Sequence, residues 1–188
     1  TLFGKSASAG VLNIATKNPG DEFEAALEAG FTDDDEMRVS GLVSGPVTDT
    51  FGVRLSGFWS DRDGHIDNLT DGKKLDGNES YGLRAKGVWD ASDRLTMTII
   101  GEVNESKDNC CAYVWQRVSP DANFFGDPAR PPAVWLDPIV PGKDNRQARV
   151  GDEPVSNSKD WGISVRFDYE IGEYTLSSIT AYREYANS

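Results

Sequence analysis

The sequence of 188 residues is poor in the side chains that usually carry catalytic or metal chemistry. It has one histidine, His65, and two cysteines, Cys110 and Cys111, which are adjacent. Metal and redox sites need a ligand spacing that adjacent cysteines without partner histidines do not provide. The acid-rich run 61–79 offers oxygen atoms to calcium, but its spacing does not match the twelve-residue calcium loop, so we expect a solvated loop. We therefore expect no metal, no cofactor and no enzymatic activity.

Long apolar runs and positive charge are also scarce. No stretch of about 18 apolar residues occurs, so the sequence predicts no transmembrane helix. Lys and Arg total 19 against 31 Asp and Glu, a net charge of -12, which argues against nucleic acid as a partner. The chain opens at Thr1 without a signal peptide, so we expect either a soluble protein or a mature or excised piece of a larger one.

What the sequence does contain is alternation with a period of two. Six stretches have apolar or uncharged residues at odd positions and charged residues at many even positions. This period is typical of β-strands, and a face without charge has to meet either a soluble β core or lipid. The six stretches are 23–31, 37–43, 51–59, 81–89, 95–103 and 161–169, and a seventh at about 174–185 has a less regular phase that permits a bulge or a phase switch.

Two features favour lipid over a soluble core. Large residues such as Tyr81 and Trp89 lie at the ends of the stretches, whereas a sandwich core has its large residues at the centre. Tight and long connections alternate, as in barrels with short turns at one end and long loops at the other. The sequence predicts an all-β fold: an antiparallel up-and-down transmembrane β-barrel meander, partial, of about seven strands, with a long loop at about 105–160.

Residues 1–19, which read TLFGKSASAGVLNIATKNP, resemble the end of the plug domain in TonB-dependent outer-membrane receptors. Gly4 and Gly10 match the two glycines of its turn, and residues 11–17 match its final strand. Three later motifs resemble the family in order: GPVTDTFGVRL at 45–55 its first periplasmic turn, DRDGHIDN at 61–68 its next loop, and LSSITAYR at 176–183 a later strand. The resemblance implies that residues 1–20 end a plug domain and that residues 21–188 form the first barrel strands.

The resemblance also implies a function. Such receptors bind a scarce nutrient, most often a ferric siderophore, otherwise cobalamin or a carbohydrate, and import it with energy from the TonB complex. The implied location is the outer membrane of a Gram-negative bacterium, with lipid around the barrel and the TonB complex bound through a region upstream of residue 1. The family barrel has about 22 strands, so seven would form a fragment. The alternative is a soluble β-sandwich binding or adhesion module with the long loop as its ligand face.

Two sets of residues are candidates for contact with a cargo. The first lies in the long loop, where aromatic and arginine side chains either bind ligand or fold the loop onto the barrel mouth: Tyr113, Trp115, Arg117, Phe124, Phe125 and Trp135. The second consists of basic residues predicted to face the lumen: Arg38, Arg54, Arg84, Lys86, Arg94 and Arg166. They either pair with acids, on a plug or at adjacent inward positions such as Glu102 and Asp168, or select an anionic cargo such as a ferric siderophore. The shared face favours pairing.

Overall fold

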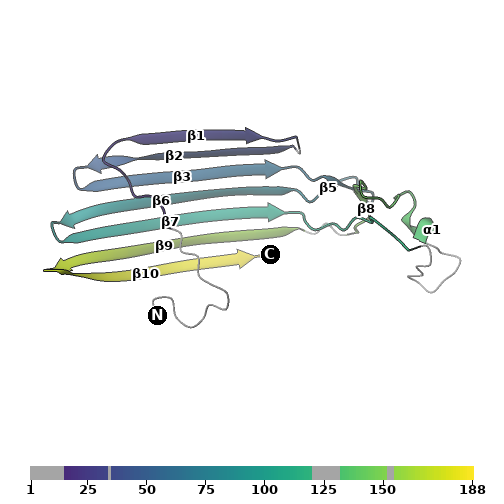
Figure 1. Cartoon of the computed structure of the whole chain (residues 1–188). Coiled ribbons are helices and arrows are strands. Elements are labelled where there is room, and N and C mark those ends of the chain that lie inside the picture. Colours follow the sequence, from purple (N-terminus) through teal and green to yellow (C-terminus); the bar gives the residue numbers. More distant parts are fainter. Residues whose placement is uncertain (1–14, 34, 120–131, 152–154) are drawn as a thin grey trace.

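The computed structural model describes residues 15–33, 35–119, 132–151 and 155–188, in which seven long strands form one antiparallel sheet (Figure 1). The strand order is β1-β2-β3-β6-β7-β9-β10, so each long strand pairs with the next long strand along the chain. This confirms the predicted seven-stranded meander. The bounds are β1 (Glu24–Phe31), β2 (Glu36–Thr48), β3 (Phe51–Arg62), β6 (Asn78–Ser92), β7 (Leu95–Asp108), β9 (Ser156–Ile171) and β10 (Tyr174–Asn187).

The pairing register places the odd positions of the first six long strands on one side of the sheet, here called the odd face. Leu55 lies opposite Ala85, Ala85 opposite Gly101, and Gly101 opposite Ile163. Ile99 and Leu55, near the middle of this face, are each 41% exposed, because no other described element packs against it. The alternation seen in the sequence is therefore a property of the sheet, and no element that the structure describes covers its apolar side.

The connections are sorted by length between the two ends of the sheet. The turns at 49–50, 93–94 and 172–173 have two residues each and lie at one end. The connections at 32–35, 63–77 and 109–155 lie at the other end, which we call the loop end. The longest begins later and ends earlier than the predicted range of about 105–160, because β7 and β9 continue past their apolar segments.

The last strand, β10, inverts the phase. Across a two-residue turn the flanking residues pair directly, so odd numbers meet even numbers. Register shifts beside the turns at 49–50 and 93–94 restore the original phase. The turn at 172–173 has a regular register, so Leu176 lies opposite Tyr169 on the odd face while Ile179 lies on the other side. The irregular phase predicted for 174–185 is thus a phase switch.

A small second sheet lies beyond the loop end of the strands. It consists of β4 (Ile66–Asn68), β5 (Lys74–Leu75) and β8 (Gln147–Ala148), in the order β5-β4-β8, with the short helix α1 (Pro132–Leu136) nearby (Figure 1). We call the described parts of 63–77 and 109–151 the cap. Ile66, Leu75 and Ala148 are buried together there. The sequence analysis did not predict this cap.

The cap is held by polar contacts as well as by its apolar cluster. Asn68 is buried, its side-chain amide donates to the carbonyl of Val150, and its side-chain oxygen accepts from the amide of Val150. Gly64 passes so close to the backbone of Leu75 that an added Cβ would clash with it. Two connections distant in the sequence are therefore joined into one structured unit.

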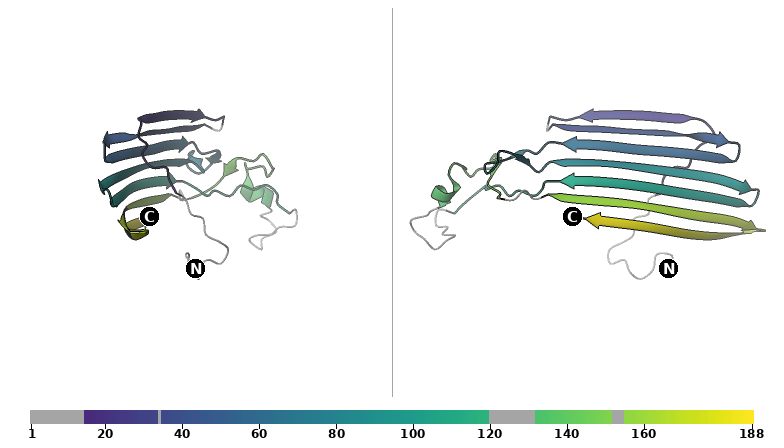
Figure 2. Two further views of the ribbon diagram at one scale, coloured as in Figure 1. Left: turned by 60° about the vertical axis from the view of Figure 1, so that its left-hand side comes forward. Right: turned by 180° about the vertical axis from the view of Figure 1, so that it is seen from behind.

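The described N-terminal segment, 15–22, runs across the strands rather than along them (Figures 1 and 2). Residues 15–17 form no strand, although 11–17 were predicted as the final plug strand; residues 11–14 lie outside the described residues. A strand needs a neighbouring strand edge to satisfy its backbone, and this segment meets the face of a sheet instead. Within the described ranges, no helix has the length and apolar character required to cross a membrane.

Candidate functional site

The face opposite the odd face carries even positions in the first six long strands and odd positions in β10, and we call it the even face. Five of the six basic residues predicted to face the lumen lie on strands at even positions: Arg38, Arg54, Arg84, Lys86 and Arg166. Arg94 lies instead in the turn between β6 and β7, where its carbonyl accepts a hydrogen bond from the amide of Glu170. The basic residues therefore do not all belong to one wall.

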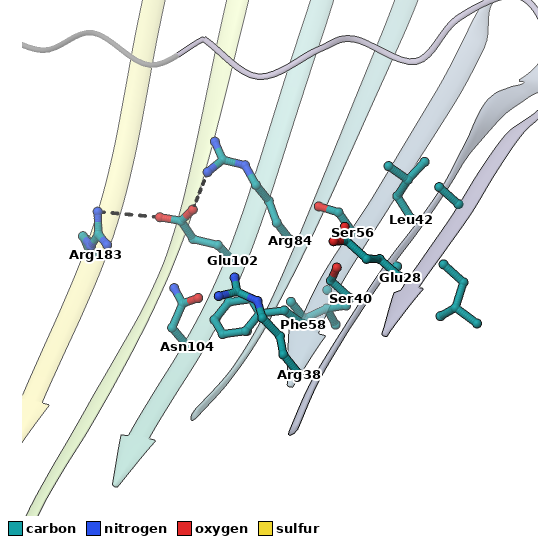
Figure 3. A pocket seen from close by; sticks show the side chains of 16 residues that line it. Glu28, Arg38, Ser40, Leu42, Ser56, Phe58, Arg84, Glu102, Asn104 and Arg183 are labelled. Atoms are coloured by element: carbon teal, nitrogen blue, oxygen red, sulfur yellow. Dashed lines mark hydrogen bonds and ion pairs between the residues drawn. The ribbon is translucent and has the colours of Figure 1, made fainter. Parts of the chain in front are cut away.

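Charges on the even face form a network across four strands, and Figure 3 shows its part around Arg84, Glu102 and Arg183. Glu102 accepts from Arg84 at 2.8 Å and pairs with Arg183 at 3.6 Å. Arg183 also donates through Nε and Nη2 to both oxygens of Asp160, at 2.6 and 2.8 Å. Asp160 lies just beyond the apolar segment of β9, and hydrogen bonds from Arg183 hold its pKa below the usual range. Arg183 was absent from the predicted site, because the phase inversion of β10 places this odd-numbered residue on the even face.

A shallow concavity of about 970 Å³ lies beside this network (Figure 3). Phe58 lies opposite Gly82, and an added Cβ at Gly82 would meet the Phe58 ring at 2.5 Å. The guanidinium carbon of Arg38 is 5.8 Å from the centre of the same ring, a cation–π contact. The missing side chain of Gly82 thus allows an aromatic ring to lie flat against the wall under Arg38.

The N-terminal segment is fastened to the even face by basic residues. The Lys86 ammonium donates to the carbonyl oxygen of Thr16 at 2.8 Å. Glu24 accepts from Lys17 at 3.0 Å and from Arg54 at 2.9 Å. An added Cβ at Gly52 would meet the Pro19 side chain, so the segment lies close to β3 there as well.

Arg166 has its own partner on the even face. Its Nε and Nη2 atoms donate to the two oxygens of Asp168, and the hydroxyl of Ser177 in β10 donates to the same carboxylate. Three arginines of the even face thus pair with acids of the same face: Arg54 with Glu24, Arg84 with Glu102 and Arg166 with Asp168. Their orientation toward a lumen stays a prediction.

The candidate loop residues separate into two groups. Tyr113 is 88% exposed, and Arg117 is exposed too. Trp115 and Trp135 pack edge to face with ring centres 5.3 Å apart, and the Trp115 carbonyl accepts hydrogen bonds from Gly142 and Asn145. The tryptophans therefore help to fold the cap. Phe124 and Phe125 lie outside the described residues, as do Gly4 and Gly10 of the plug-like motif.

The odd face becomes charged immediately beyond its apolar segments at the loop end. Glu105 accepts a hydrogen bond from the Tyr81 hydroxyl at 2.7 Å and pairs with Lys159 at 3.3 Å. The hydrogen bond from Tyr81 is the main reason that the pKa of Glu105 is lowered, with Lys159 adding to it. This change from apolar to charged residues marks one limit of the apolar zone.

The cysteines are joined to each other in a disulfide at the start of the connection after β7. Of the residues that the structure describes, no group of three or more His, Cys, Asp or Glu side chains is placed to hold a metal ion. The candidate site residues that the structure describes therefore make ion pairs, hydrogen bonds and aromatic contacts.

Comparison with known proteins gives one informative match. No family model matches the chain. The crystal structure of the ferric yersiniabactin uptake receptor FyuA from Yersinia pestis aligns with a TM-score of 0.77 at 20% sequence identity, covering 100% of this chain and 27% of that one. At this identity the match concerns the fold. The chain has a TonB-dependent receptor-like fold, and its seven-stranded meander corresponds to part of a β-barrel.

Proposed function

We propose that this chain, with its TonB-dependent receptor-like fold, forms part of the wall and one outer loop region of an outer-membrane receptor that imports a small nutrient in a Gram-negative bacterium. One observation carries the proposal: a single sheet exposes an apolar face on one side and a paired, charged face on the other. A transmembrane barrel wall needs both, because one side meets lipid and the other a polar lumen. The fold match to an uptake receptor supports the same conclusion.

The alternative of a soluble β-sandwich is not favoured. A sandwich buries the apolar side of one sheet against a second sheet, about 10 Å away. The small sheet β5-β4-β8 lies beyond the strand ends, and no described element covers Ile99 or Leu55. The uncovered apolar face supports the proposed lipid environment over a second layer.

In this proposal the strands lie in the outer membrane and the cap faces the outside. The segment 15–20 lies against the lumen side, as the end of a plug domain would, and the remainder, 21–188, supplies barrel strands. The chain spans 27% of the length of the matched receptor, so the remaining wall and the region that contacts the TonB complex belong to other parts of a larger protein. The cargo class is a ferric siderophore, with cobalamin or a carbohydrate as the other candidates.

The cap supplies the first contacts with cargo. Tyr113 and Arg117 are exposed there, and aromatic and arginine side chains are enriched among residues that dominate binding. Phe124 and Phe125 belong to the same proposed contact set. Trp115 and Trp135 act indirectly, because they hold the cap together.

The test is uptake of a radiolabelled ferric siderophore by cells that carry the complete protein. We expect uptake to require both the protein and an intact TonB complex. Tyr113→Ala and Arg117→Ala should each weaken cargo binding about tenfold, roughly 1.4 kcal/mol. Val140→Ala, which changes another exposed cap residue, is the matched control and should have no effect. Uptake that is equal with and without TonB would contradict the proposal.

A second measurement asks whether the basic face selects cargo by charge. Arg84 and Lys86 are neutralised together, and uptake of a neutral and an anionic siderophore complex is compared. A selective loss for the anionic complex would assign them to cargo selection. Unchanged uptake of both would exclude Arg84 and Lys86 from cargo selection.

A further inference from the structure

A small pocket of about 220 Å³ lies between the N-terminal segment and strands β3 and β6. Four of its six lining side chains are basic, and the full lining is Thr16, Lys17, Arg54, Ser56, Arg84 and Lys86. It adjoins the concavity that holds Arg38 and Phe58 and shares Ser56 and Arg84 with it, but neither Arg38 nor Phe58 lines it. Such a concentration of positive charge in a chain with a net charge of -12 requires an explanation.

The sheet register forces these charges together. Arg54 lies directly opposite Lys86, and Ser56 lies directly opposite Arg84, all on the even face. Like charges that face each other across two strands destabilise a sheet. The arrangement therefore calls for a negative partner between the strands.

The nearby carboxylates are already engaged. Glu24 is shared by Lys17 and Arg54, and Glu102 is shared by Arg84 and Arg183. Lys86 is 9% exposed and donates to the Thr16 carbonyl, but no described carboxylate pairs with it. Residues 1–14 contain neither Asp nor Glu, so that stretch has no carboxylate side chain to offer.

Unused hydrogen-bond donors accompany the unbalanced charge. An ammonium group has three donors, and Lys86 uses one of them on Thr16. The Nε atom of Arg84 is buried and has no hydrogen-bond partner among the described residues. Buried donors are normally satisfied, and buried charges are normally paired.

We infer that this pocket binds one oxyanion group, a phosphate or a carboxylate, held by Lys86, Arg84 and the hydroxyl of Ser56. Charge-assisted hydrogen bonds from lysine and arginine are the strong contacts that such a group makes in proteins. The group is either a free anion or an acidic group of an imported molecule. The inference concerns binding alone, so it stands or falls independently of the proposed import.

The first experiment titrates inorganic phosphate into the complete protein, purified in detergent at low ionic strength, by isothermal titration calorimetry. We expect saturable binding of one phosphate. Lys86→Met should weaken it at least tenfold, whereas Arg38→Gln, a change on the same face outside the pocket, should leave it unaltered. An absence of saturable binding, or an equal loss in both variants, would overturn the inference.

A second variant covers the case in which Lys86→Met fails to fold. Ser56→Asp places a carboxylate directly opposite Arg84 and should abolish phosphate binding while the protein still folds, as judged by heat-modifiable migration on a gel. A folded Ser56→Asp protein that binds phosphate as tightly as the wild type would also overturn the inference. The source of the anion follows from siderophore uptake by Lys86→Met: normal uptake indicates a free anion, and reduced uptake indicates an acidic group of the cargo.

Discussion

The two faces of the seven-stranded sheet share one backbone but carry different kinds of side chain. On the odd face, large apolar side chains such as Ile99 remain uncovered. On the even face, charged side chains such as Arg84, Glu102 and Asp160 find partners. A continuous exposed apolar face is unfavourable in water and favourable in lipid, which is the reason for the membrane environment proposed above. The exposed fraction of the side chains does not distinguish the two faces, whereas the positions of the charged residues do.

Aromatic residues sharpen this contrast. On the odd face Trp161 packs against Tyr182 of β10 with ring centres 5.4 Å apart, near the loop end of the apolar zone. On the even face Phe58 is covered by a guanidinium. The first arrangement suits a membrane interface, where amphipathic rings gather, and the second suits a polar lumen.

The largest expected effect comes from placing a charge on the odd face. Ile99→Arg should destabilise the folded protein by about 2–4 kcal/mol, because the charge would lie near the middle of the bilayer. Ser164→Arg, on the even face of the adjacent strand, is the matched control and should have a much smaller effect. Denaturant unfolding in lipid vesicles measures both. Equal losses would remove the distinction between the faces.

An intermediate effect is expected from filling space on the even face. Gly82→Ala should cost about 1–3 kcal/mol, because the new methyl group would displace Phe58 and Asn104. Gly101→Ala is the control on the odd face, where nothing lies within 4 Å of an added Cβ, and it should be close to neutral. The same unfolding measurement applies, and a Gly82→Ala protein as stable as the wild type would show that Phe58 does not need to lie against the wall.

The smallest expected effect concerns Asp160 at the loop end. Arg183 lowers the pKa of this carboxyl in the folded state, so its contribution to stability is present above the ordinary pKa of about 4 and is lost as the pH falls through the lower folded value. Asp160→Asn should remove part of the stability difference between pH 7 and pH 3. Unfolding curves for both proteins at the two pH values test this. An identical pH dependence would show that the Arg183 pair contributes nothing.

The sequence predicted the wall well for a physical reason. Successive side chains of a barrel strand meet two different media, so apolar and polar residues alternate along the strand, as in Leu55 and Arg54. The phase of β10 was harder to predict, because it depends on whether a bulge follows a two-residue turn. No bulge follows the turn at 172–173, so Arg183 lies on the even face and Leu176 on the odd face. No residue pattern in the turn predicted this.

The cap could not be predicted, because its contacts are distant in the sequence. Asp67 and Asn68 pair in parallel with Gln147 and Ala148, and each of these strands has only two or three residues. Stretches that short carry no readable period. The aromatic residues of the long loop were recognised, but only the structure separates the packed Trp115 from the exposed Tyr113.

The most direct test of the account compares the two faces at neighbouring positions of β7. Nitroxide labels are placed singly at residues 98 and 99 of the complete protein in lipid vesicles, and their collisions with oxygen and with a water-soluble nickel chelate are measured. The account predicts that a label at 99 collides mainly with oxygen, which concentrates in lipid, and that a label at 98 collides relatively more with the chelate. Equal accessibility at both positions, or a label at 99 that favours the chelate, would contradict it.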